Sequence, residues 1–382
     1  MNKALILFLI FIFIFVGIYG TYYFLKLQKA EDSINESILN IKEGDYDDAL
    51  NELKGVISNY DFKIVKAPAI YLLADTYEKS GKYISAIEAH QMLISDKRLS
   101  EAGNWYIRSI ISLSKLYRKG VIETSKQKTE TLKNYLNLMI ERVKEERTKN
   151  TFNNSVEYNF KRLFNSFLKL NYDLAIKDVS YDELLIELET ELGFIYLQEK
   201  KYGKAEDIFI RLNTPISKYG LAQVYLETDE EMKGIKLLWE LIKYDTTGKI
   251  RSYYIGKSFE YAENKYREKK FAEAIGIFKN IIELTENSEY AELSLYYIAT
   301  YYYNKNNPAV SMKYLNRILL NSVKSKDEKA QLLKGYIYYD RREFIKALKV
   351  FRDFIKKYPY SGHLRTAQEW KSMCERNIKY LG

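Results

Sequence analysis

The chain has 382 residues, of which 60 are Lys or Arg and 51 are Asp or Glu, so its formal net charge is +9. A single cysteine excludes an intramolecular disulfide framework, and one cysteine with two histidines cannot build a Cys/His zinc cluster. Apolar residues at 47% and charged residues at 29% are typical of a folded chain, and only 4 prolines favour long helices.

The first predicted element is an apolar helix near the N-terminus. Ala4–Leu25 contains no charged residue. As a helix it would extend roughly 33 Å, at about 1.5 Å per residue, which is enough to cross a hydrocarbon core of about 30 Å. Tyr19, Tyr22 and Tyr23 stand near its far end, where interfacial aromatic residues are common. The sequence therefore predicts an N-terminal membrane anchor over residues 1–29.

A cleaved secretory signal is the competing interpretation of the same segment. Signal peptides usually have an apolar region of about 7–15 residues and a small-x-small cleavage site. The apolar run here is longer, and its nearest candidate site, Ile18-Tyr19-Gly20, lacks the first small residue. Basic residues on the two sides scarcely differ, with Lys3 before the segment and Lys26 and Lys29 after it. We expect a retained single-pass anchor, with the large domain outside the cytoplasm.

The rest of the chain contains a repeated pattern. Six copies begin with a small residue, have a second small residue twelve positions later, and have an apolar residue nineteen positions later. Two small residues, one on each of two helices, let the helices approach closely, and the larger residues fill the grooves beside them. One such hairpin cannot bury both its faces, so neighbouring hairpins must stack. The first residues of the copies are Ala74, Gly193, Ala222, Ala262, Ala299 and Gly335.

Two of these copies resemble the tetratricopeptide repeat family. Residues 195–209 read Ile-Tyr-Leu-Gln-Glu-Lys-Lys-Tyr-Gly-Lys-Ala-Glu-Asp-Ile-Phe, and residues 335–351 follow the same helix-turn-helix pattern. The resemblance implies an all-α fold, a right-handed solenoid of helix hairpins with a concave groove. Between most neighbouring copies, the second small residues are 29–40 residues apart, around the usual repeat period of about 34.

The domain limits follow from how well each segment matches the pattern. We expect tetratricopeptide-like repeats over residues 30–180, degenerate from about residue 100, and regular repeats over residues 181–360. The degenerate part still has helical apolar patterns at Trp105–Tyr117, Leu132–Val143 and Val156–Leu168. Residues 361–382 are predicted to form a capping helix.

Enzyme signatures are absent from the sequence. It has no Walker loop, no Gly-rich dinucleotide turn, no Gly-x-Ser-x-Gly and no His-Glu-x-x-His. His90 occupies the large apolar position of its repeat, which predicts a packed core imidazole. Cys374 lies in the last helix and is expected to be a buried, unreactive thiol. We therefore predict a protein that is not an enzyme and that needs no metal, cofactor or small-molecule substrate.

The candidate binding residues are aromatic. In the resembling family, the first helix of each hairpin lines the groove, and tyrosine offers a large rigid contact surface with a polar tip. The competing interpretation is packing between repeats in a chain that contains 36 tyrosines. We name the predicted set the aromatic stripe; its members are Phe259, Tyr266, Tyr296, Tyr297, Tyr303, Tyr336 and Tyr339.

The distribution of charge bears on the class of partner. Residues 178–231 carry 13 acidic and 5 basic side chains, whereas residues 115–177 carry 14 basic and 7 acidic ones. A nucleic-acid-binding protein would be expected to have one basic face instead. Blocks of alternating sign favour protein partners, including a second copy of this chain, over nucleic acid, and solvated helix faces are the simplest alternative.

Taken together, these patterns predict a membrane-anchored scaffold of the bacterial cell envelope that binds partner proteins through a groove of its repeats. Envelope assembly, chaperoning near the translocon and the collar of periplasmic flagella all fit this description. The alternative is a soluble periplasmic chaperone or cell-wall assembly factor, released after cleavage of a signal peptide.

Overall fold

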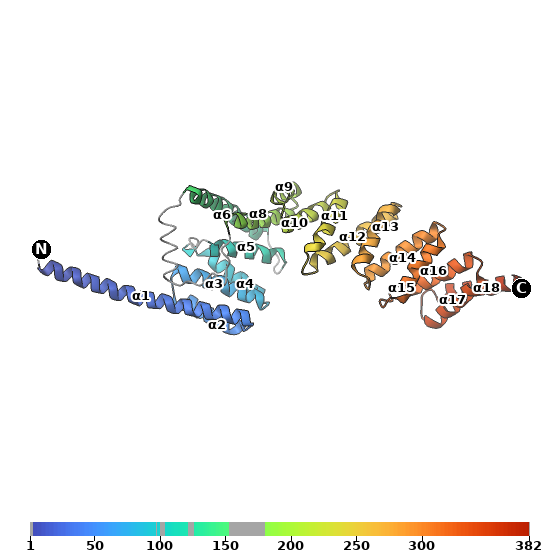
Figure 1. Ribbon diagram of the computed structural model, residues 1–382, viewed down its shortest axis with the longest axis horizontal. Coiled ribbons are helices and arrows are strands. Elements are labelled where there is room, and N and C mark those ends of the chain that lie inside the picture. The colour runs from blue at the N-terminus through green and yellow to red at the C-terminus, as the bar shows by residue number, and fades with distance from the viewer. Residues whose placement is uncertain (1–2, 97, 100–103, 121–125, 153–179, 382) are drawn as a thin grey trace. The chain divides into compact units, whose positions relative to one another are not determined.

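The computed structural model describes residues 3–96, 98–99, 104–120, 126–152 and 180–381 of the chain. These residues are helical, and no strand occurs among them, so the predicted all-α class is confirmed (Figure 1). By their internal contacts the residues form two compact units, Met1–Val224 and Tyr225–Gly382. This boundary differs from the predicted limit at residue 180, which rests on repeat regularity and stays a prediction.

The N-terminal unit begins with a long helix followed by shorter ones. Each of α1 to α6 contacts the next helix, and α8 packs against α5, α6 and α9. The helices are α1 (Lys3–Glu43), α2 (Tyr46–Asn59), α3 (Lys63–Lys79), α4 (Tyr83–Ser95), α5 (Asn104–Arg118), α6 (Lys126–Phe152), α8 (Tyr181–Gln198), α9 (Tyr202–Leu212) and α10 (Pro215–Leu226), whose last two residues fall in the C-terminal unit.

The C-terminal unit continues the hairpin pattern. From α11 onward each α-helix contacts the following one, and α12, α14 and α16 also contact one another in series. The helices are α11 (Glu231–Leu241), the 3₁₀ turn η3 (Ile242–Tyr244), α12 (Lys249–Arg267), α13 (Phe271–Leu284), α14 (Glu289–Asn304), α15 (Pro308–Leu320), α16 (Asp327–Asp340), α17 (Phe344–Lys357) and α18 (Leu364–Leu381).

Close helix approach at small residues gives each hairpin its geometry. A methyl group added at Gly335 of α16 would stand 2.6 Å from the Phe351 ring of α17. The same addition at Gly193 of α8 would stand 2.6 Å from the Phe209 ring of α9. Both rings are fully buried. The small residue and the ring sixteen positions later therefore fit together as the repeat pattern predicts.

The turn between the two helices of a hairpin also recurs. Lys200, Lys269, Asn306 and Arg342 all have φ between 55° and 64°, in the left-handed region, and each directly follows the end of a first helix or its cap. In the α12–α13 turn, Lys269 N donates to Tyr266 O and Lys270 N donates to Lys265 O. A left-handed residue here satisfies the last carbonyl groups of the helix and reverses the chain.

The degenerate region is helical where the structure describes it. α5 and α6 contain the patterns predicted at Trp105–Tyr117 and Leu132–Val143, and they join α4 and α8 in one hydrophobic cluster. The predicted pattern at Val156–Leu168 lies outside the described residues. α18 lies within the segment predicted as a capping helix and packs on α17.

The predicted anchor lies in the first half of α1. For residues 3–17 only the course of the helix is described, and the side chains are not. Within the described residues, no helix combines the length and apolar character needed to span a membrane. The second half of α1 buries Leu27, Ala30 and Ile34 against α2 and α3.

Candidate protein-binding face

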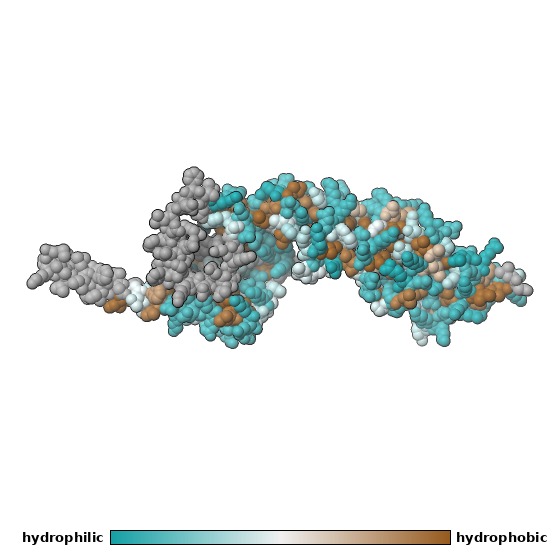
Figure 2. All heavy atoms as spheres, viewed as in Figure 1, coloured by the Kyte–Doolittle hydropathy of each residue, from teal (hydrophilic) through white to brown (hydrophobic). Residues whose placement is uncertain are grey.

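The aromatic stripe lies on three helices that contact one another in series, α12, α14 and α16. Six of its seven members are half-buried, so part of each ring or hydroxyl group faces solvent. Hydrophilic residues predominate on the face of the C-terminal unit shown in Figure 2, with apolar residues between them. Half-buried aromatic side chains suit recognition by a protein partner, because rigid rings lose little conformational entropy on binding.

Two tyrosines of α14 bind carboxylates on the neighbouring first helices. Tyr297 Oη donates to Glu263 Oε1 of α12 at 2.6 Å, and Tyr303 Oη donates to Asp340 Oδ2 of α16 at 2.6 Å. Burial, followed by the hydrogen bond to the carboxylate, raises the pKa of each phenol to about 12. Both hydroxyl groups therefore keep their proton at neutral pH, and the two bonds hold α14 in register with its neighbours.

The expected exposure of Phe259 is wrong. Its side chain is only 9% exposed. The ring lies 5.7 Å from Phe278 of α13 and 5.3 Å from Tyr290 at the start of α14, and the Tyr297 ring follows at 6.3 Å. Phe259 therefore belongs to the packing beneath the stripe, because the neighbouring hairpin covers it.

Tyr266 and Tyr296 stay at the surface of the face. The Tyr266 ring stands edge-on to that of Tyr297, with 5.0 Å between centroids. Burial raises the pKa of both Tyr266 and Tyr296, so they too are uncharged donors near neutral pH. These side chains provide ring surface between α12 and α14 rather than charge.

The terminal helix completes the face with a residue that the repeat pattern does not indicate. The indole of Trp370 in α18 lies 4.9 Å from the rings of both Tyr336 and Tyr339. Asn377 Nδ2, about two helix turns further on, donates to Tyr339 Oη at 2.9 Å. The sequence signal for Trp370 was an aromatic residue in the predicted capping helix. The repeat offsets are counted between the two helices of one hairpin, and α18 has no second helix of its own among the described residues, so the offsets could not be applied to it.

The structure thus brings six of the seven predicted residues onto one surface and places the seventh below it. The binding role of the aromatic stripe stays a prediction. Ring contacts and hydroxyl–carboxylate bonds make the face ordered before any partner arrives, which lowers the entropic cost of binding.

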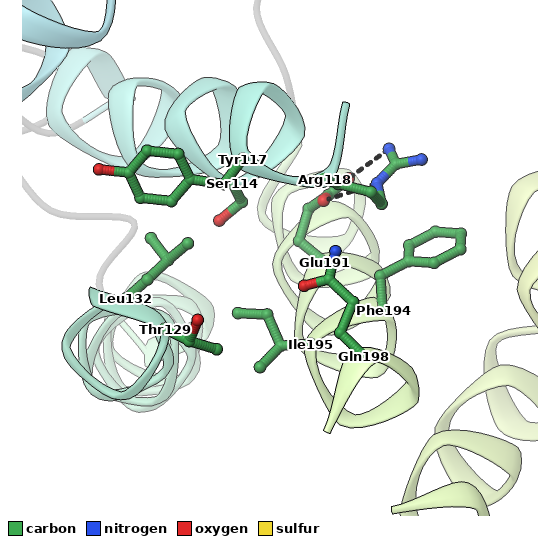
Figure 3. Close-up of a pocket in the computed structure, with 9 residues that line it drawn as sticks. All are labelled: Ser114, Tyr117, Arg118, Thr129, Leu132, Glu191, Phe194, Ile195 and Gln198. Carbon is green, nitrogen blue, oxygen red and sulfur yellow. Dashed lines mark hydrogen bonds and ion pairs between the residues drawn. The ribbon is translucent and has the colours of Figure 1, made fainter. Parts of the chain in front are cut away.

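The N-terminal unit contains a small internal pocket between α5, α6 and α8 (Figure 3). Its volume of about 10 Å³ is near the space of one water molecule and far below that of a small-molecule site. Arg118 Nη2 pairs with the buried Glu191 at 3.1 Å, while burial raises the pKa of that carboxyl despite the guanidinium. Ser114 Oγ also faces the pocket and has no hydrogen-bond partner among the described residues. A water molecule is the occupant that this space and chemistry suit.

His90 is a buried imidazole, as predicted, but it is not isolated. Its Nδ1 lies 3.1 Å from Ser109 Oγ of α5, and its Nε2 lies 3.3 Å from Glu78 Oε1 of α3. Serine, histidine and glutamate in a row resemble a nucleophile relay. Ser109 is fully buried, however, so no substrate can reach its hydroxyl group. The row is a polar network that joins three helices.

Glu31 and Cys374 are buried titratable groups with a raised pKa. Glu31 of α1 is 5% exposed, and burial, together with the charge of Asp32, raises its pKa to about 7. Cys374 of α18 is fully buried, and burial raises the pKa of its thiol to about 11. Within the described residues, no three His, Cys, Asp or Glu side chains are grouped so that they could hold a metal ion.

Helix hairpins with a small-residue approach, left-handed turns and serial packing of first helices define an α-helical repeat protein. Comparison with protein families identifies the kind of repeat: residues 329–361 match the model described as tetratricopeptide repeat. The resemblance seen in the sequence is thus confirmed, and the match covers the hairpin α16–α17. This fold is typical of non-catalytic scaffolds that bind other proteins.

Solved structures with similar helix arrangements are also tetratricopeptide repeat proteins. One from Parabacteroides merdae is 15% identical, with 91% of this chain and 99% of that chain covered at a TM-score of 0.33. One from Thermus thermophilus is 16% identical, with 60% and 98% covered at 0.34. The P58(IPK) tetratricopeptide domain is 15% identical, with 92% and 99% covered at 0.29. No curated protein matches the chain.

Proposed function

We propose that this protein is a membrane-anchored scaffold that binds partner proteins through the aromatic stripe of its C-terminal unit. The observation that carries the proposal is the ordered, half-exposed surface across α12, α14 and α16, held by the Tyr297–Glu263 and Tyr303–Asp340 hydrogen bonds. A surface fixed in advance and rich in tyrosine has the composition and rigidity of protein-binding surfaces.

Substitution separates binding from packing. In the double variant Tyr296→Ala/Tyr336→Ala we expect the full-length protein to lose partner capture in cells while keeping most of its thermal stability. A matched control is Tyr244→Ala/Tyr380→Ala, which removes two tyrosines that are 59% and 86% exposed and lie outside the stripe. If the control abolishes capture equally, or if the stripe variant simply unfolds, the proposed role of the stripe is wrong.

The proposed anchor is the charge-free segment Ala4–Leu25. It continues into the second half of α1, whose residues Leu27, Ala30 and Ile34 are buried against α2 and α3. A helix that is continuous from an anchor into a packed domain would fix the first hairpin at the bilayer surface, without a flexible linker. We propose a periplasmic location for the repeats and a role in assembly, chaperoning or a flagellar collar of the cell envelope.

The single cysteine allows a direct test of this topology. Cys374 is buried and its thiol pKa is raised to about 11, so it should not react with a maleimide near neutral pH. A Ser322→Cys variant adds an exposed thiol in the α15–α16 loop. We expect a membrane-impermeant maleimide to label this variant on cells with a permeabilised outer membrane. Labelling only after lysis of the inner membrane would place the repeats in the cytoplasm instead.

The alternative is a soluble periplasmic chaperone or cell-wall assembly factor. It shares the binding surface and differs in the fate of residues 1–29. N-terminal sequencing of the mature protein distinguishes the two. A start near residue 21 would replace the anchor proposal with the soluble one, and an intact N-terminus in the membrane fraction would support the anchor.

A further inference from the structure

The C-terminal unit has an open hollow beside the aromatic stripe. It is lined by residues of the α12–α13 turn and of the end of α14, and its volume is about 370 Å³. That volume falls in the range of ligand sites and can accommodate one or two side chains. Its lining residues are Lys269, Lys270, Phe271, Ala272, Glu273, Tyr301 and Lys305.

The aromatic part of the hollow is a ring pair. Phe271, the first residue of α13, and Tyr301 of α14 have centroids 5.1 Å apart, and both side chains are half-buried. The next hairpin junction lacks such a pair, because the position equivalent to Tyr301 in the next first helix is Ile337, which is fully buried. An apolar or aromatic side chain could pack on these two rings without disturbing the core.

The cationic part consists of three lysines. Lys270 pairs with Glu268 at 2.8 Å, whereas Lys269 and Lys305 form no ion pair with the described residues. Lys269 is held in place because its backbone has the left-handed conformation, with φ 64°, and its N–H donates to Tyr266 O. Two solvated cations without a described carboxylate partner, next to exposed ring surface, are complementary to an anion that carries an apolar group.

The carboxylates nearby restrict which anion fits. Glu273 accepts a hydrogen bond from Tyr261 Oη at 2.5 Å, and Glu268 pairs with Lys265 and Lys270. A nucleic-acid backbone would bring phosphates against these carboxylates. Binding to a membrane surface usually requires about 4–8 basic residues in a cluster, whereas this hollow has three. A short acidic peptide segment needs neither a continuous row of phosphates beside these carboxylates nor a larger basic cluster.

We propose that this hollow binds an acidic peptide segment of a partner protein, with an aromatic side chain on Phe271 and Tyr301 and flanking carboxylates at Lys269 and Lys305. The site adjoins the aromatic stripe, because the Phe271 ring lies 5.0 Å from the ring of Tyr266, so a partner could contact both surfaces. Two linked contacts raise the effective concentration of the second and increase overall affinity without any new interaction.

The test uses the full-length protein in detergent and a fluorescein-labelled peptide, Asp-Glu-Phe-Glu-Asp, with anisotropy as the measurement. We expect saturable binding that weakens as the salt concentration rises. The peptides Asn-Gln-Phe-Gln-Asn and Asp-Glu-Ala-Glu-Asp, which lack the charges or the ring, should bind several-fold more weakly. Equal binding of the uncharged peptide would overturn the proposal.

Variants locate the peptide in the hollow. Lys269→Asn/Lys305→Gln should weaken binding about fivefold, since each exposed charge pair contributes about 0.2–1 kcal/mol. Asparagine is chosen because it tolerates the left-handed backbone at position 269. The control Lys279→Gln/Lys313→Gln removes the same charge from exposed lysines of α13 and α15 and should leave binding unchanged. Equal weakening by the control would mean that net charge, not the hollow, attracts the peptide.

Two further measurements distinguish the hollow from the aromatic stripe, and the acidic peptide from other anions. Tyr296→Ala/Tyr336→Ala should leave peptide binding intact, so that failure of the stripe and failure of the hollow are distinguishable. Inorganic polyphosphate and phosphatidylglycerol vesicles serve as the other anions. If either binds through Lys269 and Lys305 while the acidic peptide does not, the occupant proposed here is wrong.

Discussion

One packing position differs between a hairpin of the N-terminal unit and a hairpin of the C-terminal unit. In hairpin α3–α4 of the N-terminal unit, the residue sixteen positions after the small residue is His90, which contacts Ser109 and Glu78. In hairpin α16–α17 of the C-terminal unit, the same position is Phe351, whose ring lies against Gly335. Both side chains are buried. The same position can thus hold a side chain of a polar network or an aromatic ring. We expect these two arrangements to lose stability under different substitutions.

The difference extends beyond one residue. The N-terminal unit also buries Glu31 and Glu191, both with a raised pKa. The C-terminal unit buries the carboxylates of Glu292 and Asp327 as well, but it also stacks aromatic rings, with Tyr297 parallel to Phe278 at 5.0 Å and Trp370 in contact with Tyr336 and Tyr339. Polar networks depend on every partner and on pH, whereas ring stacks depend on volume. The following variants test this comparison, from the largest expected effect to the smallest.

Gly335→Ala should destabilise the C-terminal unit by about 2–3 kcal/mol, because the new methyl group overlaps the Phe351 ring. Hydrogen exchange of α16 and α17 in the full-length protein measures the loss. The control is Gly276→Ala in α13, where the added methyl group meets nothing within 4 Å. That control should stabilise the protein by about 0.5–1 kcal/mol through helix propensity. Equal effects of the two variants would contradict the close-approach account.

Glu31 should make the first hairpin less stable as pH rises. Its pKa is near 7 in the folded protein against 4.5 for the free side chain, so the folded state binds more protons between these values. Stability is then fully present below about pH 4.5, falls as pH rises to about 7 and is constant above. Glu31→Gln should remove this slope in α1 and α2 and add about 1–2 kcal/mol at pH 8. If the pH dependence of stability persists in Glu31→Gln, other titratable groups cause it.

His90→Phe should destabilise the N-terminal unit by about 1 kcal/mol, although phenylalanine is the residue that other repeats use. The change leaves Ser109, which is fully buried, without its imidazole partner. Ser109→Ala in the same chain should restore much of the loss, and thermal melting of the single and double variants gives the coupling. If His90→Phe lowers the thermal stability equally with and without Ser109→Ala, the network contributes nothing to stability.

Tyr303→Phe has the smallest expected effect, a loss of about 0.5–1 kcal/mol in the C-terminal unit. It removes only the hydroxyl group that donates to Asp340, and Asp340 is exposed and can bind water instead. Denaturant unfolding measures the change. A loss as large as that of Gly335→Ala would mean that the Tyr303 hydroxyl group is a major structural support rather than part of a binding surface.

The sequence predicted the hairpins because their signal is local. A small residue at 193 or 335, with its ring sixteen positions on, fixes how closely two adjacent helices pack, and Pro215 and Pro308 are the first residues of α10 and α15, where proline is favoured. No such signal exists for α5 and α6, which pack by long-range apolar contacts.

Contacts between hairpins were harder to predict. Burial of Phe259 and the contact of Trp370 with Tyr336 depend on how far each hairpin rotates against the next. That rotation depends on many side chains together, so no fixed residue spacing in the sequence indicates it. The stripe residues lie on α12, α14 and α16, their binding role stays a prediction, and the expected exposure of Phe259 was wrong.

The most direct test of the central claim is site-specific photo-crosslinking in living cells. A benzophenone amino acid replaces Glu260, an exposed residue of α12 beside the aromatic stripe, or Lys279, an exposed control residue of α13. A scaffold that binds through the stripe should give a discrete protein adduct from position 260 and none from position 279, and Tyr296→Ala/Tyr336→Ala should abolish that adduct. Identical adducts from both positions, or an adduct that survives the double substitution, would contradict binding at the aromatic stripe.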